Sequence, residues 1–280
     1  MAEISMSKRV YDSHARNGLF YEPFKAFWDY RALIFLLVKR DIAVRYKRSL
    51  LGLFWTLLNP LLTSLILWFV FINIFSVKLP DGTQFAPYLL AGILLINFFT
   101  QGFNQASESI TENSQILMKI YVPPQVFAFS GALSNAINFC FGLFALLTIS
   151  IISGDRISFY FPATIIVILS MLMFVTGLGL LAAICYVRYE DTRNIFSILV
   201  PFMMYLSPVF YPKEILSGSI LAVVNANPLT SFLDVFRYVF SNTGSASWAD
   251  WAYMGGFSAF ILIMGIRSFA KAWPRTVVMM

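Results

Sequence analysis

Charged side chains are scarce in this sequence. Asp, Glu, Lys and Arg together make up 12% of the 280 residues, whereas about a quarter of an ordinary soluble domain is charged. Apolar residues make up 59% of the chain, and its mean hydropathy is +0.73. A soluble chain of this size needs polar side chains to cover its surface. The composition therefore excludes an ordinary soluble domain and indicates a membrane protein.

Cysteine and histidine are almost absent, which removes several kinds of chemistry. The two cysteines, Cys140 and Cys185, lie inside apolar runs, and this favours buried thiols over a disulfide framework. The single histidine, His14, lies in a polar segment and is expected to be solvated. The sequence contains no HExxH, no CxxC pair and no GxxxxGK[ST] phosphate loop. We therefore expect no catalytic residue, no metal, no cofactor and no nucleotide hydrolysis on this chain.

Ionisable residues are also missing from the middle of the long apolar segments. Carriers driven by protons or sodium ions usually keep an Asp, Glu, Lys or His near the membrane midplane. Between residues 50 and 212 the nearest candidate is Glu108, which we interpret as interfacial. A transporter with neither an ion site nor a nucleotide site needs an energy source on another protein.

Uncharged stretches define the predicted fold, since about 20 apolar helical residues cross a bilayer. We predict an all-α polytopic membrane protein with a cytoplasmic tail at 1–20 and a single transmembrane domain at 21–275. Its six spans are expected at about 50–77, 86–108, 125–153, 161–187, 194–211 and 249–270. Residues 215–233 are also uncharged but contain Ser, Gly, Asn and Pro. We interpret them as short re-entrant helices between spans five and six, with a seventh full span as the alternative.

The distribution of Lys and Arg predicts the orientation. With six spans and a cytoplasmic N-terminus, sixteen of the twenty Lys and Arg residues fall inside and four outside. The positive-inside rule therefore predicts a multi-pass plasma-membrane protein with both termini in the cytoplasm. A seventh span would move the C-terminal charges outside, which weakens that alternative. The first thirty residues carry charges and no apolar core, so we expect no cleaved signal peptide.

An aromatic-rich segment and a basic cluster precede the first span. Phe24, Phe27, Trp28, Phe35 and Val38 fall roughly on one helical face, which predicts an amphipathic helix in the inner headgroup layer. The basic cluster that follows consists of Lys39, Arg40, Arg45, Lys47 and Arg48. Attraction to anionic lipid explains such a cluster without a specific ligand. The alternative is a receptor for a lipid-linked diphosphate, because Arg binds phosphate oxygens in a bidentate manner.

Five segments carry a resemblance to a known family. RDIAVRYKRSLLGLFWTLLNPL at 40–61 resembles the start of the membrane subunits of ABC exporters for lipid-linked polysaccharides, such as O-antigen, capsule, teichoic acid and the actinobacterial arabinogalactan precursor. Four more segments follow in family-like order: ENSQILMKIYVPPQV at 112–126, RYEDTRN at 188–194, SPVFYPKEI at 207–215 and NANPLTSFLDVFR at 225–237. The resemblance covers most of residues 22–270. One departure is Pro123–Pro124, where the family pattern has Pro followed by a basic residue.

The resemblance implies a homodimer of this chain joined to two copies of a separate cytoplasmic ABC ATPase. The implied substrate is a polyprenyl-diphosphate-linked polysaccharide, and we favour galactan because the sequence looks closest to actinobacterial members of the family. Membrane lipids are expected partners and nucleic acid is not. Two alternatives stay open: a drug or lipid ABC exporter permease, and a membrane-embedded polyprenyl-phosphate glycosyltransferase. The latter needs acidic residues to hold metal, and Glu190–Asp191 is the only such pair near the inner surface.

Three groups of residues are candidates for function. Reception of the lipid diphosphate is assigned to Arg40, Arg45, Tyr46, Lys47 and Arg48. Docking of the ATPase, or else folding back onto the inner leaflet, is assigned to Met118, Lys119, Ile120 and Tyr121. The wall of a glycan channel is assigned to Trp55, Asn59, Trp68, Phe69, Phe202, Tyr205 and Phe210. Aromatic faces stack on sugars without fixing hydrogen bonds, although the same side chains also suit contact with lipid.

Overall fold

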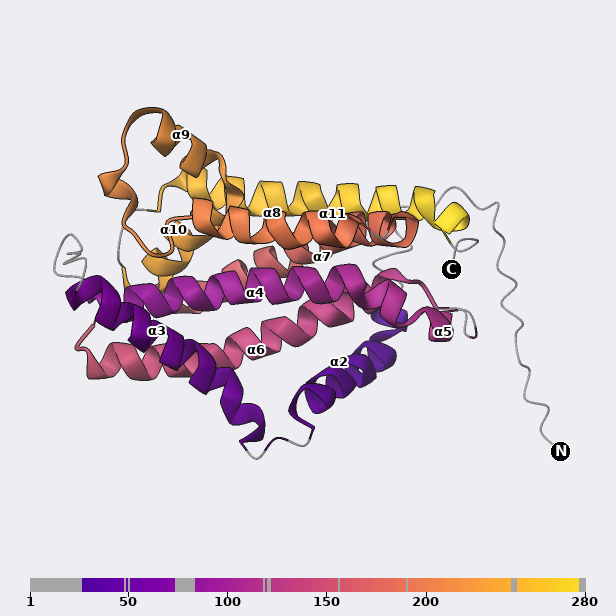
Figure 1. Cartoon of the computed structure of the whole chain (residues 1–280), viewed down its shortest axis with the longest axis horizontal. Helices are drawn as coiled ribbons and strands as arrows, with labels where there is room; N and C mark the ends of the chain where they lie inside the picture. Colours follow the sequence, from indigo (N-terminus) through magenta and orange to yellow (C-terminus); the bar gives the residue numbers. More distant parts are fainter. Residues whose placement is uncertain are drawn as a thin grey trace.

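The computed structural model describes residues 27–47, 49, 51–73, 84–117, 119, 122–155, 157–189, 191–242 and 246–276. Throughout these ranges the regular structure is helical, which confirms the predicted all-α class. Long helices run side by side along the long axis of the molecule (Figure 1). They are α4 (Phe85–Glu112), α6 (Gln125–Ile152), α7 (Thr164–Arg188) and α11 (Trp248–Thr276).

Among the described residues, five helices are long and apolar enough to cross a membrane: these four and α3 (Trp55–Asn73). The segment expected as the fifth span contains α8 (Thr192–Leu206), which has 15 residues. At 1.5 Å per residue it extends about 22 Å, short of the roughly 30 Å hydrocarbon core. Helix α8 ends at Leu206 because Pro208 disfavours a helical conformation at Ser207, whose ψ is 145°.

Two short helices follow α8, in the region where the sequence predicted re-entrant helices. They are α9 (Gly218–Ala226) and α10 (Pro228–Ser241), and their axes differ by 83°. Asn227 lies at the bend and accepts a hydrogen bond from the backbone N–H of Leu229 at 3.1 Å. With Pro228 at the first position of α10, this is a favourable helix start. The pair has the geometry of a broken span or a re-entrant loop, and as one broken span it would be the sixth crossing.

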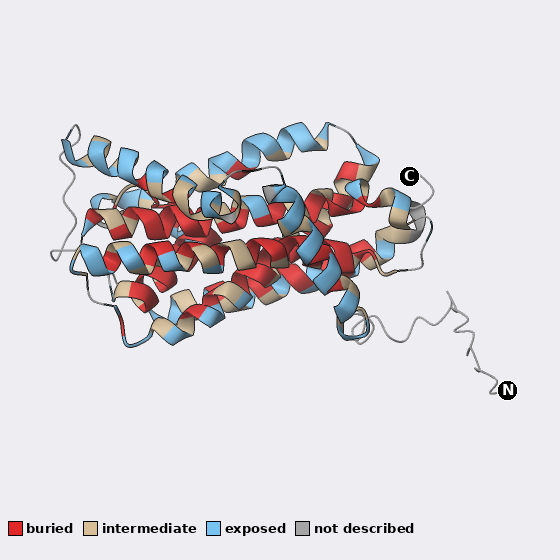
Figure 2. Ribbon diagram, turned by 90° about the horizontal axis from the view of Figure 1, so that it is seen from below, coloured by how far each residue is buried: buried red, intermediate tan, exposed pale blue. Residues whose placement is uncertain are grey.

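Helix α4 is the centre of the bundle and packs against both α6 and α7. Buried residues are concentrated along the middle of the bundle (Figure 2). By contrast, Pro60 and Ser64 are the buried residues of α3, and Val200 is that of α8. Helices α3 and α8 therefore leave large apolar faces uncovered, available to lipid or to another chain.

Glycine allows α7 and α11 to approach closely. A Cβ atom on Gly177 of α7 would lie 2.6 Å from the carbonyl oxygen of Ile261, and one on Gly265 of α11 would meet the carbonyl oxygen of Gly177. Small residues commonly occupy such crossings, because membrane helices associate largely through close packing. This contact fixes the C-terminal helix against the core.

A buried arginine connects α10, α4 and the segment after α8. Arg237 is 4% exposed and donates hydrogen bonds to the carbonyl oxygens of Pro208 (2.8 Å) and Val209 (3.1 Å). Its guanidinium lies 3.5 Å from the ring centroid of Tyr88 and also donates to the hydroxyl of that residue at 2.9 Å. Arg237 thus holds α10, α4 and the segment after α8 together inside the protein. The sequence had instead placed this residue in a loop on the outer side of the membrane.

Helix α2 (Arg31–Tyr46) precedes the first span and packs on the start of α6. Ile34, Leu37 and Val38 form a buried cluster with Val126 and Phe127. The opposite side of α2 exposes further apolar residues, namely Phe35, Leu36 and Val44. Residues 27–29 are also helical, and α2 extends past the aromatic pattern, so Lys39, Arg40 and Arg45 lie on the helix itself; Phe24 lies outside the described residues.

Candidate functional site

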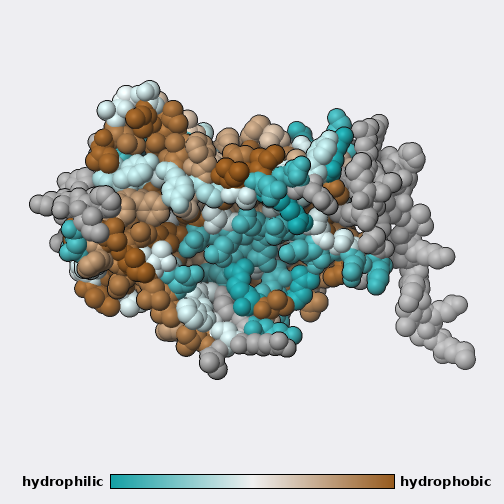
Figure 3. Space-filling model, viewed as in Figure 1, coloured by the Kyte–Doolittle hydropathy of each residue, from teal (hydrophilic) through white to brown (hydrophobic). Residues whose placement is uncertain are grey.

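A cavity of about 290 Å³ opens between α3, α4 and α6, at the C-terminal end of α2. Its walls are mainly polar side chains and aromatic rings. The lining residues are Arg45, Ser49, Trp55, Thr56, Asn59, Pro60, Leu94, Asn97, Phe98, Gln101, Asn135, Asn138 and Phe139. Figure 3 shows hydrophilic surface across the centre of the face seen in Figure 1, flanked by hydrophobic surface over α3.

Carboxamide side chains from α4 and α6, together with Asn59 of α3, line this cavity. In α4, Asn97, Gln101 and Gln105 are spaced four residues apart and so lie above one another on one helical face. In α6, Asn135 and Asn138 are three residues apart. None of these carboxamides on α4 and α6 was predicted as a site residue, although their helical spacing is visible in the sequence.

Asn97 and Asn138 lie near the midpoints of α4 and α6, where polar groups are costly unless they have partners. Both polar atoms of the Asn138 side chain are buried, and neither has a hydrogen-bond partner in the described part of the chain. An unpaired buried amide costs about 1–3 kcal/mol. Asn138 is therefore an unsatisfied amide in the wall of the cavity.

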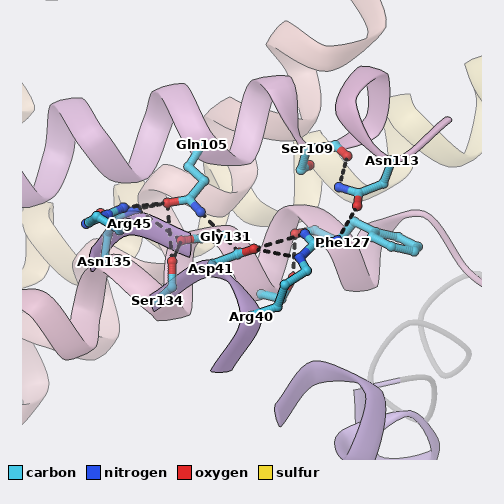
Figure 4. Close-up of polar contacts among 11 residues, drawn as sticks. Arg40, Asp41, Arg45, Gln105, Ser109, Asn113, Phe127, Gly131, Ser134 and Asn135 are labelled. Atoms are coloured by element: carbon cyan, nitrogen blue, oxygen red, sulfur yellow. Dashed lines mark hydrogen bonds and ion pairs between the residues drawn. The ribbon is translucent and has the colours of Figure 1, made fainter. Parts of the chain in front are cut away.

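Arg45 is held at one end of the cavity by neutral partners (Figure 4). Its guanidinium donates to Gln105 Oε1 at 3.0 Å, to Asn135 Oδ1 at 3.2 Å and, more weakly, to Gln101 Oε1 at 3.5 Å. These acceptors orient the positive charge but do not neutralise it, since all three are carboxamides. A guanidinium held in this way suits a phosphate group.

Gln105 is the hub of this polar network. Its Oε1 atom also accepts from Asn135 Nδ2 at 2.7 Å and from Ser134 Oγ at 3.2 Å. Its Nε2 atom donates to Asp41 Oδ2 on α2 at 3.1 Å. One side chain therefore joins α2, α4 and α6 around the cavity.

The network continues from Asp41 toward the loop between α4 and α6. Arg40 donates to Asp41 Oδ1 from Nε at 3.1 Å and from a terminal nitrogen at 2.9 Å. Its other terminal nitrogen donates to Asn113 Oδ1 at 2.8 Å. Asn113 directly precedes the short helix α5 (Ser114–Leu117), so hydrogen bonds connect α5 to the cavity.

Comparison with known proteins identifies the kind of protein that carries this cavity. Residues 32–241 match the family described as ABC-2 type transporter. The chain belongs to this family. The membership that the sequence resemblance predicted is therefore confirmed, and this ABC-2 chain is a transporter membrane subunit rather than an enzyme.

Curated relatives match this ABC-2 chain over most of its length. It is 24% identical to the O-antigen export system permease protein RfbA of Klebsiella pneumoniae, over 85% of this chain and 91% of the relative. It is 27% identical to RfbA of Myxococcus xanthus, over 76% of this chain and 82% of the relative. It is 24% identical to the capsule polysaccharide export inner-membrane protein CtrC of Neisseria meningitidis, over 86% of this chain and 91% of the relative.

The predicted reception group of this ABC-2 chain divides between different surroundings. Arg45 lines the cavity, whereas Arg40 is paired with Asp41 and Asn113. Lys47 is exposed, and the side chain of Tyr46 and the whole of Arg48 lie outside the described residues. In the predicted docking group, Lys119 is exposed, whereas Met118, Ile120 and Tyr121 lie outside the described residues.

The predicted channel residues fall into three groups. Trp55 and Asn59 line the cavity. Phe210 is half-buried and stacks on Phe71, with 6.3 Å between the ring centroids. The other four are exposed on α3 and α8, namely Trp68, Phe69, Phe202 and Tyr205. The cavity and the two exposed helices are thus separate candidates for contact with a substrate.

Proposed function

We propose that this chain is the membrane subunit of an exporter that moves a polyprenyl-diphosphate-linked polysaccharide from the cytoplasm to the outer face of the plasma membrane. The names of its relatives, which concern O-antigen and capsule export, support this substrate class. The observation that carries the proposal is the Arg45 guanidinium, held by carboxamides at a polar cavity among membrane helices. Arg45 would bind the diphosphate, and the neighbouring amides suit sugar hydroxyls.

The physical need for such a cavity follows from the cargo. Moving a bare phosphate charge into hydrocarbon costs on the order of tens of kcal/mol before relaxation. The diphosphate and the glycan therefore need a polar route, whereas the polyprenyl tail can remain in lipid. Galactan is our preferred glycan, on the basis of the sequence resemblance to actinobacterial members of the family.

Energy would come from two copies of a separate ATPase bound to a homodimer of this chain. The end of the molecule that carries α2, α5 and the C-terminal end of α11 would face the cytoplasm (Figure 1). Met118, Lys119, Ile120 and Tyr121 would dock the ATPase next to α5. The glycan channel would run between the protomers, with the exposed aromatic faces of α3 and α8 contributing to its wall.

Depletion of the protein in its host tests the proposal. We expect radiolabelled lipid-linked polysaccharide to accumulate on the cytoplasmic side, and its sugar composition to identify the cargo. Complementation with a charge-reversed Arg45→Glu, Arg48→Glu variant should restore membrane insertion but not export.

Lys39→Glu is the matched control for this experiment, because Lys39 is an exposed member of the same basic cluster and does not line the cavity. If the cluster only attracts anionic lipid, the control will lose export as the double variant does. Normal export by the double variant would refute a reception site at Arg45.

A further inference from the structure

The cavity has a charged end and an uncharged end. Arg45 contacts Gln101 of α4 and Asn135 of α6. Asn97 and Asn138 lie about one helical turn beyond these contacts, which is roughly 5 Å along each helix axis. This is comparable to the separation between a phosphate and the centre of a sugar ring bonded to it. A diphosphate at Arg45 therefore brings its attached sugar to the uncharged end.

The uncharged end has the chemistry that a sugar ring requires. Carboxamides both donate and accept hydrogen bonds, and Asn59, Asn97 and Asn138 present them from three helices. Both polar atoms of the Asn138 amide are buried in the wall of this end and have no hydrogen-bond partner among the described residues, a deficit that a ring hydroxyl bound there would relieve. Phe98 and Phe139, each 3% exposed and stacked on one another, form the apolar part of the wall at this end.

The size and charge of the cavity narrow the ligand further. A volume of about 290 Å³ is at the lower limit of small-molecule sites, which span roughly 300–1,000 Å³. It suits one ring rather than a length of polymer. Among the described residues of the lining, Arg45 alone is charged, so a carboxylate on the sugar would find no cation among the residues described at the uncharged end.

We infer that the uncharged end of this cavity binds the sugar ring attached directly to the diphosphate, and that it selects a neutral ring over an acidic one. This inference rests on the proposed function and deepens it, because it assigns recognition to the first sugar of the glycan. The channel can then pass the remaining polymer without reading it.

Binding measurements on the complex of this chain with its ATPase in lipid nanodiscs test the inference. The probes are farnesyl diphosphate alone, farnesyl diphosphate carrying one glucose, and the same compound carrying one glucuronic acid. We expect the glucose probe to bind about tenfold more tightly than the other two, since a factor of ten needs only one or two net hydrogen bonds. Lipid-free maltose, which supplies rings without a diphosphate, should not compete with the glucose probe.

Variants separate the ring site from the phosphate site. Asn138→Leu should abolish the preference for glucose and leave the affinity for farnesyl diphosphate unchanged. Because this substitution removes an unpaired buried amide, it should also raise the thermal stability. Asn59→Ala, on the exposed side of α3, should reduce the same preference without disturbing the core. Arg45→Gln should weaken the binding of all three probes alike.

The outcomes distinguish the inference from the proposed function. Equal binding of all three probes would overturn the ring site and leave the diphosphate site intact. An Asn138→Leu variant that loses bare farnesyl diphosphate as strongly as the glucose probe would also overturn it. If no probe binds, both the ring site and reception at Arg45 are refuted.

Discussion

Replacing Gln105 by leucine removes the hub of the network around Arg45 while nearly keeping the side-chain volume. Two of the lost hydrogen bonds involve charged partners, Arg45 and Asp41. Ser134 and Asn135 also lose Gln105 as an acceptor, but the effect on stability is smaller because both still donate to the carbonyl oxygen of Gly131. Interhelical hydrogen bonds in membranes average about 0.6 kcal/mol and reach about 1.7 kcal/mol. Two charge-assisted hydrogen bonds near that upper value predict that Gln105→Leu lowers the free energy of unfolding by about 2–3 kcal/mol.

Unfolding in mixed micelles with increasing dodecyl sulfate measures this loss directly. Asn104→Leu is the matched control, because Asn104 precedes Gln105 on α4, is exposed, and makes no side-chain hydrogen bond to the described residues. We expect the control to change the free energy of unfolding by less than about 0.5 kcal/mol, as surface substitutions usually do. A Gln105→Leu variant as stable as this control would refute the account of the network.

Three further predictions concern other parts of the molecule. Arg237→Met should destabilise the protein by about 3–5 kcal/mol, because it removes a buried guanidinium and leaves its carbonyl acceptors without a donor. The same dodecyl sulfate titration measures this change in the free energy of unfolding. Gly265→Ala should lower the free energy of unfolding by about 1–3 kcal/mol, because the added methyl group pushes α11 away from α7. Gly256→Ala is the control on the same helix, because its Cβ atom would meet no atom within 4 Å. Equal thermal midpoints of the two variants would contradict this prediction. A Met118→Ala, Tyr121→Ala double variant should lose the stimulation of the partner ATPase in reconstituted complexes, and unchanged stimulation and export would remove the docking assignment.

Most of the fold was predicted from the length of the uncharged stretches, because the thickness of the bilayer sets the length of a membrane-spanning helix. The length of a stretch could not predict that α8 stops at Leu206, since an uncharged run does not reveal a local turn. Helix α2 shows the same limit. Its buried face depends on contacts with Val126 and Phe127, which are distant in sequence.

The candidate site was predicted only in part, and the reason is chemical. Arg45 stood out because it is charged, and the structure places it at the cavity. The carboxamides beside it carry no charge and do not interrupt an apolar span, so a search for ionisable residues passed over them. Arg40 and Arg45 belong to the same basic cluster in the sequence, yet among the described residues Arg40 has a carboxylate partner and Arg45 has none, and a long-range contact with Asn113 further distinguishes Arg40.

Reconstitution into liposomes tests the central claim most directly. The helices of this ABC-2 chain are held to provide a route for the glycolipid and no energy of their own. With labelled natural glycolipid, we expect transport against its gradient only when the partner ATPase and ATP are both present. Uphill transport by this chain alone would contradict the account.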